Sequence, residues 1–165
     1  MRTVGQIMKS PVITTKPGET ARDLLNLSNQ RHIRHFPVVE NDQMLGLVTE
    51  RNIREATVTP RAYSLLLDLL ASIDQVLVND IMVRDVVVAS PEMSLREAAK
   101  LVVERRIGCL PVLREGKLVG IVTVVDLLGA LLADEMAERQ PPLAFAKGDG
   151  HGETGRSSLA ILTAP

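Results

Sequence analysis

The strongest constraint in this sequence is a repeat that runs without a gap at a spacing of 74 residues. The segment 36–52 aligns with the segment 110–126, and each segment has apolar and β-branched residues on both sides of a short polar turn. The same spacing holds upstream, where Val4, Ile7, Met8, Pro17, Arg22, Leu27, Arg31 and Ile33 meet Val78, Ile81, Met82, Pro91, Arg96, Leu101, Arg105 and Ile107. Repeated units usually pack on each other to bury a face that neither can bury alone.

Each copy predicts a strand, a helix, a hairpin and a second helix. In the first copy the single strand is expected at Val12–Thr15. In the second copy the hairpin strands are Leu110–Leu113 and Leu118–Thr123, and Gly116 supplies the positive φ that the turn needs. We therefore expect an α+β fold of two βαββα-like units, related by an approximate two-fold axis.

The helix starts carry recognisable capping pairs, in which a hydroxyl residue precedes an acidic residue by three positions. These pairs are Thr20 with Asp23 and Ser94 with Glu97. Thr59-Pro60 opens a further apolar periodic stretch, which predicts a helical linker at 57–77. The last helix is expected to start near Thr123 and to end before Pro141. The Gly- and Pro-rich remainder of 133–165 is expected to be mobile.

These features resemble a known family. An Ile-Met start, a Pro before a short helix, an apolar-Pro-Val strand and a Gly-x-Val-Thr-x-x-Asp ending are similar to the CBS motif. Two motifs in tandem resemble a CBS pair, or Bateman module, with motifs at 4–56 and 78–132. The stretch Glu50–Ala56, followed by a helical linker, is most similar to the acetoin-utilisation AcuB type. That type carries a further ACT domain, and this chain is too short to hold a complete one.

Composition excludes several classes of function. The formal net charge is −1, and there are two Phe, one Tyr and no Trp, which disfavours a nucleic-acid surface. The single Cys109 fits a reducing compartment, and the first ten residues contain no apolar signal core. The apolar run 118–133 is too short for a membrane span and is interrupted by Asp126. A cytoplasmic location without membrane or nucleic-acid contact is therefore expected.

Thr123 and Asp126 are the strongest candidates for chemistry. On the residues alone they form a helix start, in which Thr123 caps the helix and Asp126 favours its positive end. The resemblance implies a second role, because CBS modules use these positions to hold the phosphate and ribose hydroxyls of an adenosyl ligand. A carboxylate can accept both hydrogen bonds of a cis-diol. In the first copy Asn52 stands in place of the Asp, so the site around Thr49 is expected to be weaker.

The resemblance also implies how the two sites are composed. A segment of one copy faces the cleft whose acid comes from the other copy, so Arg34 and His35 would lie near the phosphates of a ligand on Asp126. Arg suits a phosphate through its planar fork, and protonated His35 would make binding depend on pH. The main site is expected to contain Ser10, Pro11, Ile33, Arg34, His35, Ile121, Thr123 and Asp126. The weaker site is expected to contain Ile107, Gly108, Leu47, Thr49 and Asn52.

The expected function is that of a regulatory module. It would sense AMP, ADP, ATP or S-adenosylmethionine and signal to a regulated enzyme or transporter. The alternative is a dimeric scaffold with a degenerate ligand site, and an enzyme is the third reading. No metal constellation or nucleophile–base pair is visible in the sequence. A homodimer is expected because apolar helix stripes need cover, namely Ala21, Leu24, Leu25, Leu95, Ala98, Ala99, Val102, Leu127, Leu128, Leu131 and Leu132.

Overall fold

The computed structural model describes residues 2–57 and 75–139. The elements, in chain order, are η1 (Val4–Gln6), α1 (Ala21–Arg31), β1 (His35–Glu40), β2 (Gln43–Thr49), α2 (Glu50–Thr57), α4 (Val78–Ile81), α5 (Leu95–Arg105), β3 (Cys109–Arg114), β4 (Lys117–Thr123) and α6 (Val124–Arg139). This order confirms the α+β fold of two repeated units. Most of the expected linker helix, and the tail beyond α6, lie outside the described residues.

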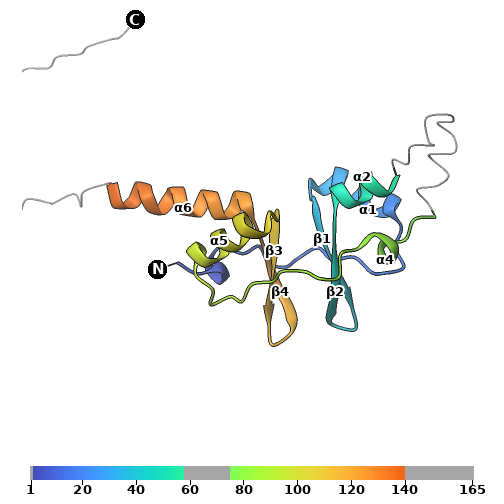
Figure 1. Cartoon of the computed structure of the whole chain (residues 1–165), viewed down its shortest axis with the longest axis horizontal. Coiled ribbons are helices and arrows are strands. Elements are labelled where there is room, and N and C mark those ends of the chain that lie inside the picture. Colours follow the sequence, from blue (N-terminus) through green and yellow to red (C-terminus); the bar gives the residue numbers. More distant parts are fainter. Residues whose placement is uncertain (1, 58–74, 140–165) are drawn as a thin grey trace, which may run out of the picture.

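Two antiparallel hairpins stand side by side at the centre of the molecule, with helices at both outer ends (Figure 1). Strand β1 pairs with β2 and β3 pairs with β4, and both hairpins shift register at the same place, after Val38 and after Val112. Gly116 turns the second hairpin with a φ of 78°, as the sequence predicted. The strand expected at Val12–Thr15 is reduced to one parallel bridge between Thr15 and Val38.

The short segments that precede the helices cross over between the two halves. The N–H of Val4 donates to Met93 of the second copy at 2.8 Å, and the N–H of Val78 donates to Glu19 of the first copy at 2.9 Å. Val4 is fully buried in the core around Leu110, whereas Val78 is fully buried in the core around Phe36. Each copy therefore completes the hydrophobic core of the other.

The crossing continues onto the hairpins and explains two glycines. Met8 passes over Gly120, and Val83 lies across Gly46 with its carbonyl 2.6 Å from the point where a Cβ would stand. The bridges Lys9–Ile121 and Leu47–Val83 fix both crossings. A side chain at either glycine would collide with the crossing segment, so the backbone can approach this closely only at Gly.

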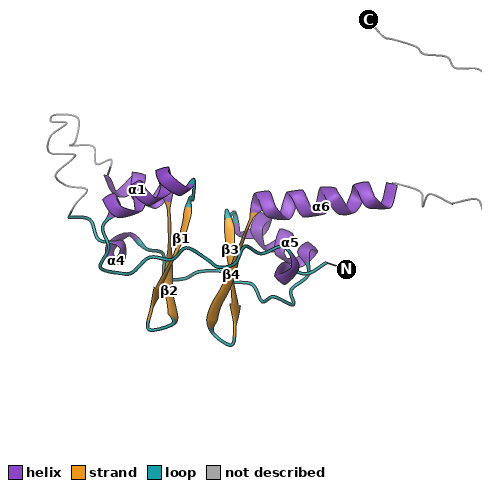
Figure 2. Cartoon of the chain, turned by 180° about the vertical axis from the view of Figure 1, so that it is seen from behind, coloured by secondary structure: helices purple, strands orange, loops and turns teal. Residues whose placement is uncertain are grey.

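Helices α1 and α5 follow the crossing segments (Figure 2), and a capping pair starts each of them. The N–H of Asp23 donates to the Thr20 hydroxyl, and the N–H of Glu97 donates to the Ser94 hydroxyl, both at 3.2 Å. Both helices close on a residue in the left-handed region. The predicted capping boxes are therefore present in both copies.

The helix stripes are covered differently from the sequence-based expectation. Most of the residues that were assigned to a seam between chains are buried inside their own half, namely Ala21, Leu24, Leu95, Ala98, Val102 and Leu127. These six residues find cover within one chain, so the expectation that they need a second copy is wrong. Exposed apolar side chains gather instead along α6, at Val125, Leu128, Leu131, Leu132 and Met136. Among the described residues no helix is long and apolar enough to cross a membrane.

Candidate functional site

Each hairpin ends in a Thr–Asx pair that opens the next helix with the same geometry. In the first copy, Asn52 Oδ1 accepts from the Thr49 N–H at 2.9 Å and from the Thr49 hydroxyl at 2.7 Å. In the second copy, Asp126 Oδ2 accepts from the Thr123 N–H at 2.9 Å and from its hydroxyl. Capping thus uses one side-chain oxygen in each copy, and the other polar atom of Asn52 or Asp126 is left for different partners.

The spare oxygen of Asp126 is held by Lys9. The Lys9 ammonium lies 2.9 Å from Asp126 Oδ1, and the carboxylate side chain is only 15% exposed. Burial raises the pKa of Asp126, but hydrogen bonds from Thr123 and the Lys9 charge outweigh this effect and hold the pKa below its ordinary value. Asp126 therefore stays ionised. Val83 stands at the matching position opposite Asn52, so the first copy has no such ammonium.

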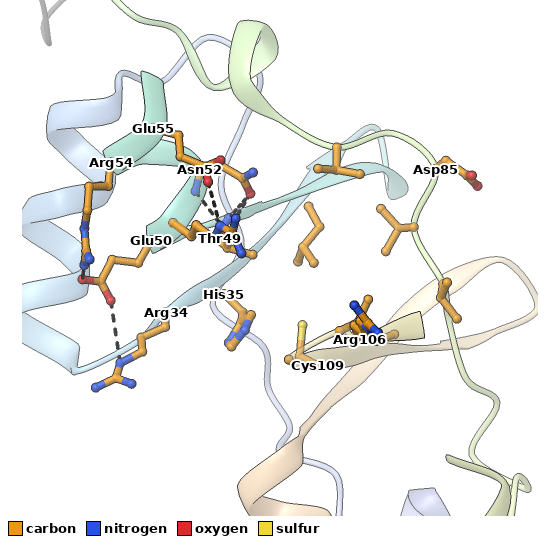
Figure 3. Close-up of a pocket in the computed structure, with 17 residues that line it drawn as sticks. Arg34, His35, Thr49, Glu50, Asn52, Arg54, Glu55, Asp85, Arg106 and Cys109 are labelled. Atoms are coloured by element: carbon orange, nitrogen blue, oxygen red, sulfur yellow. Dashed lines mark hydrogen bonds and ion pairs between the residues drawn. The ribbon is translucent and has the colours of Figure 1, made fainter. Parts of the chain in front are cut away.

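A cavity of about 740 Å³ opens beside the Thr49–Asn52 pair, between the two halves (Figure 3). The apolar part of its wall comes from Leu47, Val83, Val86, Val87 and Ile107. The charged part consists of Arg34, Glu50, Arg51, Arg54, Glu55, Asp85 and Arg106. An apolar slot with a polar, charged rim is the usual form of a small-molecule site.

Most arginines of this rim are held by glutamates. Arg51 lies 2.7 Å from Glu55, Arg54 lies 2.7 Å from Glu50, and Arg34 lies 3.7 Å from the second oxygen of Glu50. Arg106 differs, because its side chain makes no ion pair or hydrogen bond with any residue in the described part of the chain. A free guanidinium at the rim can bind an anion without breaking an existing ion pair.

His35 and Gly108 meet where the two halves approach. A Cβ built on Gly108 would lie 2.8 Å from His35 Nε2, so any side chain at this position would displace the imidazole. Burial lowers the pKa of His35, and the Arg34 charge lowers it further. Burial raises the pKa of the neighbouring Cys109 thiol to about 12, so this cysteine stays protonated and is a poor nucleophile.

The structure gathers one set of sequence-predicted site residues and spreads the other. All five residues assigned to the weaker site line the 740 Å³ cavity, and Arg34 and His35 line it too, although the sequence assigned them to the Asp126 site. Ser10 and Pro11 line a separate cavity of about 510 Å³, together with Asp42 and Lys117. Ile33 packs against the first core, and Ile121 pairs with Lys9. Thr123 and Asp126 line neither of these two cavities, and which Thr–Asx pair binds ligand more tightly stays a prediction.

Several lining residues escaped the sequence-based reasoning. Asp85, Val86 and Val87 follow the second Ile-Met pair, in the register that places Pro11 in the first copy. Applying the 74-residue spacing to Pro11 would have pointed to Asp85. Arg51, Arg54 and Glu55 could have been found from their places on the same predicted helix as Asn52. Within residues 2–57 and 75–139, no group of three or more His, Cys, Asp or Glu could hold a metal ion.

Known proteins share both the sequence pattern and the fold of this chain. The CBS domain profile matches residues 4–59 and 78–133. A CBS domain-containing protein of Dictyostelium discoideum is 35% identical over 141 residues, covering 84% of this chain and 96% of that protein.

Solved structures match as well, among them two that are similar to this chain over most of its length. Arabidopsis thaliana CBSX2 in complex with AMP is 26% identical, with a TM-score of 0.67 over 82% of this chain and 99% of CBSX2. AcuB from Vibrio cholerae is 30% identical, with a TM-score of 0.69 over 86% of this chain and 99% of AcuB. The chain therefore belongs to the CBS-domain family and carries two CBS domains in tandem.

Proposed function

We propose that this chain is a regulatory module that binds an adenosyl nucleotide between its two CBS domains. The observation that carries this proposal is the cavity beside Asn52, whose walls come from both halves and combine an apolar slot with a charged rim. CBSX2, which shares the fold and a quarter of the sequence, has been solved with AMP. AMP, ADP, ATP and S-adenosylmethionine are the candidate ligands, and no catalytic step is assigned to the module.

The proposal places ligand contacts on both Thr–Asx pairs. In the second copy, Thr123 and Asp126 would hold a ribose diol, and Ser10, Pro11 and Ile121 are the further candidate contacts. In the first copy, the candidate contacts are Leu47, Thr49, Asn52, Ile107 and Gly108. Arg34 and His35 line the Asn52 cavity, and Ile33 leads into them along the chain.

Transmission would follow from binding across the two halves. A ligand shifts a conformational equilibrium only if it binds one state more tightly than the other. Contacts to both walls of a cleft meet this condition, because they are made fully only when the halves are closed. A partner enzyme or transporter that distinguishes closed from open modules would then respond to the nucleotide.

A thermal-shift screen with AMP, ADP, ATP, S-adenosylmethionine and NAD tests this function. At least one adenosyl compound should stabilise the chain, and Asp126→Ala should weaken binding by about 1–3 kcal/mol if Asp126 holds the diol. Calorimetry should resolve two unequal sites. The function is rejected if none of these compounds raises the melting temperature, and the role of Asp126 is rejected if Asp126→Ala binds as tightly as the parent.

A second candidate function is that of a dimeric scaffold. The observation in its favour is the apolar row on α6, formed by Val125, Leu128, Leu132 and Met136, whose side chains are 55–76% exposed. We propose that this row joins two copies of the chain, since a two-fold interface covers the same patch on both. One chain can be both a scaffold and a sensor. A ligand that changes the behaviour of the dimer indicates a sensor, whereas a dimer that does not respond to ligand is a scaffold alone.

A further inference from the structure

The two Thr–Asx pairs leave opposite hydrogen-bonding groups outside the capping bonds. Asn52 Oδ1 already accepts two hydrogen bonds from Thr49, one of them from a backbone N–H that can only donate, so the amide orientation is fixed. Its Nδ2 group makes no hydrogen bond to any residue that the structure describes. In the second copy the corresponding atom is Asp126 Oδ1, an acceptor that holds the Lys9 ammonium.

The charged groups around the two pairs differ as well. On α2, Arg51 and Arg54 line the Asn52 cavity together with Glu55 and Glu50, with which they form ion pairs, whereas the matching positions on α6 are uncharged. The unpaired Arg106 adds a guanidinium from the opposite half. The Asn52 cavity therefore offers two donors that no described residue occupies, the Asn52 amide and the Arg106 guanidinium, whereas the second oxygen of Asp126 is an acceptor.

We propose that the Asn52 cavity selects phosphate-rich nucleotides, and that it places a phosphate rather than a ribose diol against Asn52 Nδ2 and the Arg106 guanidinium. The inference deepens the proposed function and rests on it. A phosphate is an acceptor-only anion, which matches an amide N–H and a planar guanidinium fork. Nucleoside di- and triphosphates are the class that fits, because their phosphates present several acceptor oxygens to these two donors.

Calorimetry on the full chain with tripolyphosphate, and separately with adenosine, tests this selection. Asn52→Asp preserves the capping bonds, because Asp126 makes the same bonds to Thr123. It should weaken tripolyphosphate binding about tenfold and strengthen adenosine binding, because it exchanges a donor for a charged acceptor. Arg106→Gln should also weaken tripolyphosphate. Asn41→Asp carries the same charge change at the far end of the β1–β2 hairpin, about 20 Å away by strand rise, and should leave both affinities unchanged.

The selection is overturned if the parent does not bind tripolyphosphate, or if Asn52→Asp binds it as tightly as the parent. It is also overturned if Asn52→Asp strengthens both probes. These failures are distinct from failure of the proposed function. A chain that binds AMP but not tripolyphosphate keeps the regulatory function and loses the phosphate selection. A chain that binds tripolyphosphate at Asn52 but no adenosyl compound loses the function as proposed.

Discussion

The Lys9 ammonium lies 2.9 Å from Asp126 Oδ1, and this ion pair joins the first crossing segment to the helix start of the opposite half. Lys9 is placed there by its backbone bridge to Ile121, in which the Lys9 N–H donates to the Ile121 carbonyl at 2.9 Å. In the other half, Val83 occupies the matching place opposite Asn52. A protein cation therefore already binds the second oxygen that a ribose diol would contact at Asp126.

Replacing Lys9 with Met should strengthen adenosine binding at Asp126 by about fivefold, because a neutral ligand no longer competes with an ammonium for Oδ1. Folding stability should fall by no more than about 1 kcal/mol, since the Lys9 side chain is 68% exposed. Calorimetry gives the affinity, and urea unfolding gives the stability. Lys16→Met makes the same change at an exposed position outside both cavities. Weaker adenosine binding by Lys9→Met would show that Lys9 contacts the ligand rather than competing with it.

Gly46→Ala and Gly120→Ala should both lower the free energy of unfolding, by about 1–3 kcal/mol, because the new methyl group collides with a crossing segment. The loss should be larger at Gly46, where the methyl meets the Val83 backbone carbonyl, than at Gly120, where it meets the side chain of Met8. Gly129→Ala is the control, because a Cβ there meets nothing within 4 Å and alanine favours a helix. If urea unfolding gives the same free energy for all three variants, collision with a crossing segment is not the cause of the destabilisation.

The pH dependence of stability should report His35. Burial lowers the pKa of His35 in the folded chain, and the Arg34 charge lowers it further, so the unfolded chain binds a proton at a higher pH. His35 therefore contributes stability that is present above its ordinary pKa of about 6.5 and is lost as pH falls through the lowered value. The urea concentration at the unfolding midpoint of the parent should decrease as the pH is lowered from about 7 to about 5.

His35→Gln removes this titration and should flatten part of that fall in the urea midpoint. His32→Gln makes the same substitution at an exposed position three residues earlier, and it should keep the slope of the parent. An unchanged slope in His35→Gln would show that other groups account for the whole dependence on pH.

The exposed row on α6 should hold a dimer together. Light scattering at micromolar concentration should report twice the chain mass of 18.0 kDa. Leu128→Glu places a charge in the row and should give a monomer that keeps its cooperative unfolding, since Leu128 is 55% exposed in the single chain. Val103→Glu changes an exposed apolar residue on α5, outside the row, and should leave the mass unchanged. A parent that scatters as a monomer would contradict the interface.

The local structure was readable from the sequence because its signals act over a few residues. The capping pair at Ser94 and Glu97 and the turn at Gly116 depend on neighbouring backbone, so their chemistry is visible in a short window. The repeat itself predicted two matched hairpins. The crossing of Val4 and Val78 was not readable, because a repeat shows which residues are equivalent but not which copy each one packs against.

In the candidate site, too, local contacts were predictable from the sequence and contacts between the halves were not. Thr49 with Asn52 and Thr123 with Asp126 were identified as pairs, because three-residue spacing at a helix start brings the side chains together. The Lys9 contact on Asp126 and the place of His35 beside Gly108 depend on how the halves pack. The burial of the apolar helix stripes was mispredicted for a related reason. Leu24 and Leu95 pack against hairpins of their own chain, which the sequence does not show.

The crossing segments also govern the order in which the molecule can fold. The first core is complete only when Val78, from the start of the second copy, packs into it. Val4 can make its hydrogen bond only after Met93 has been synthesised. During synthesis, the first copy therefore leaves the ribosome with its interior open on one side. Contacts between such distant residues carry a large loop-closure cost, so folding should be slower than the short hairpins alone would allow.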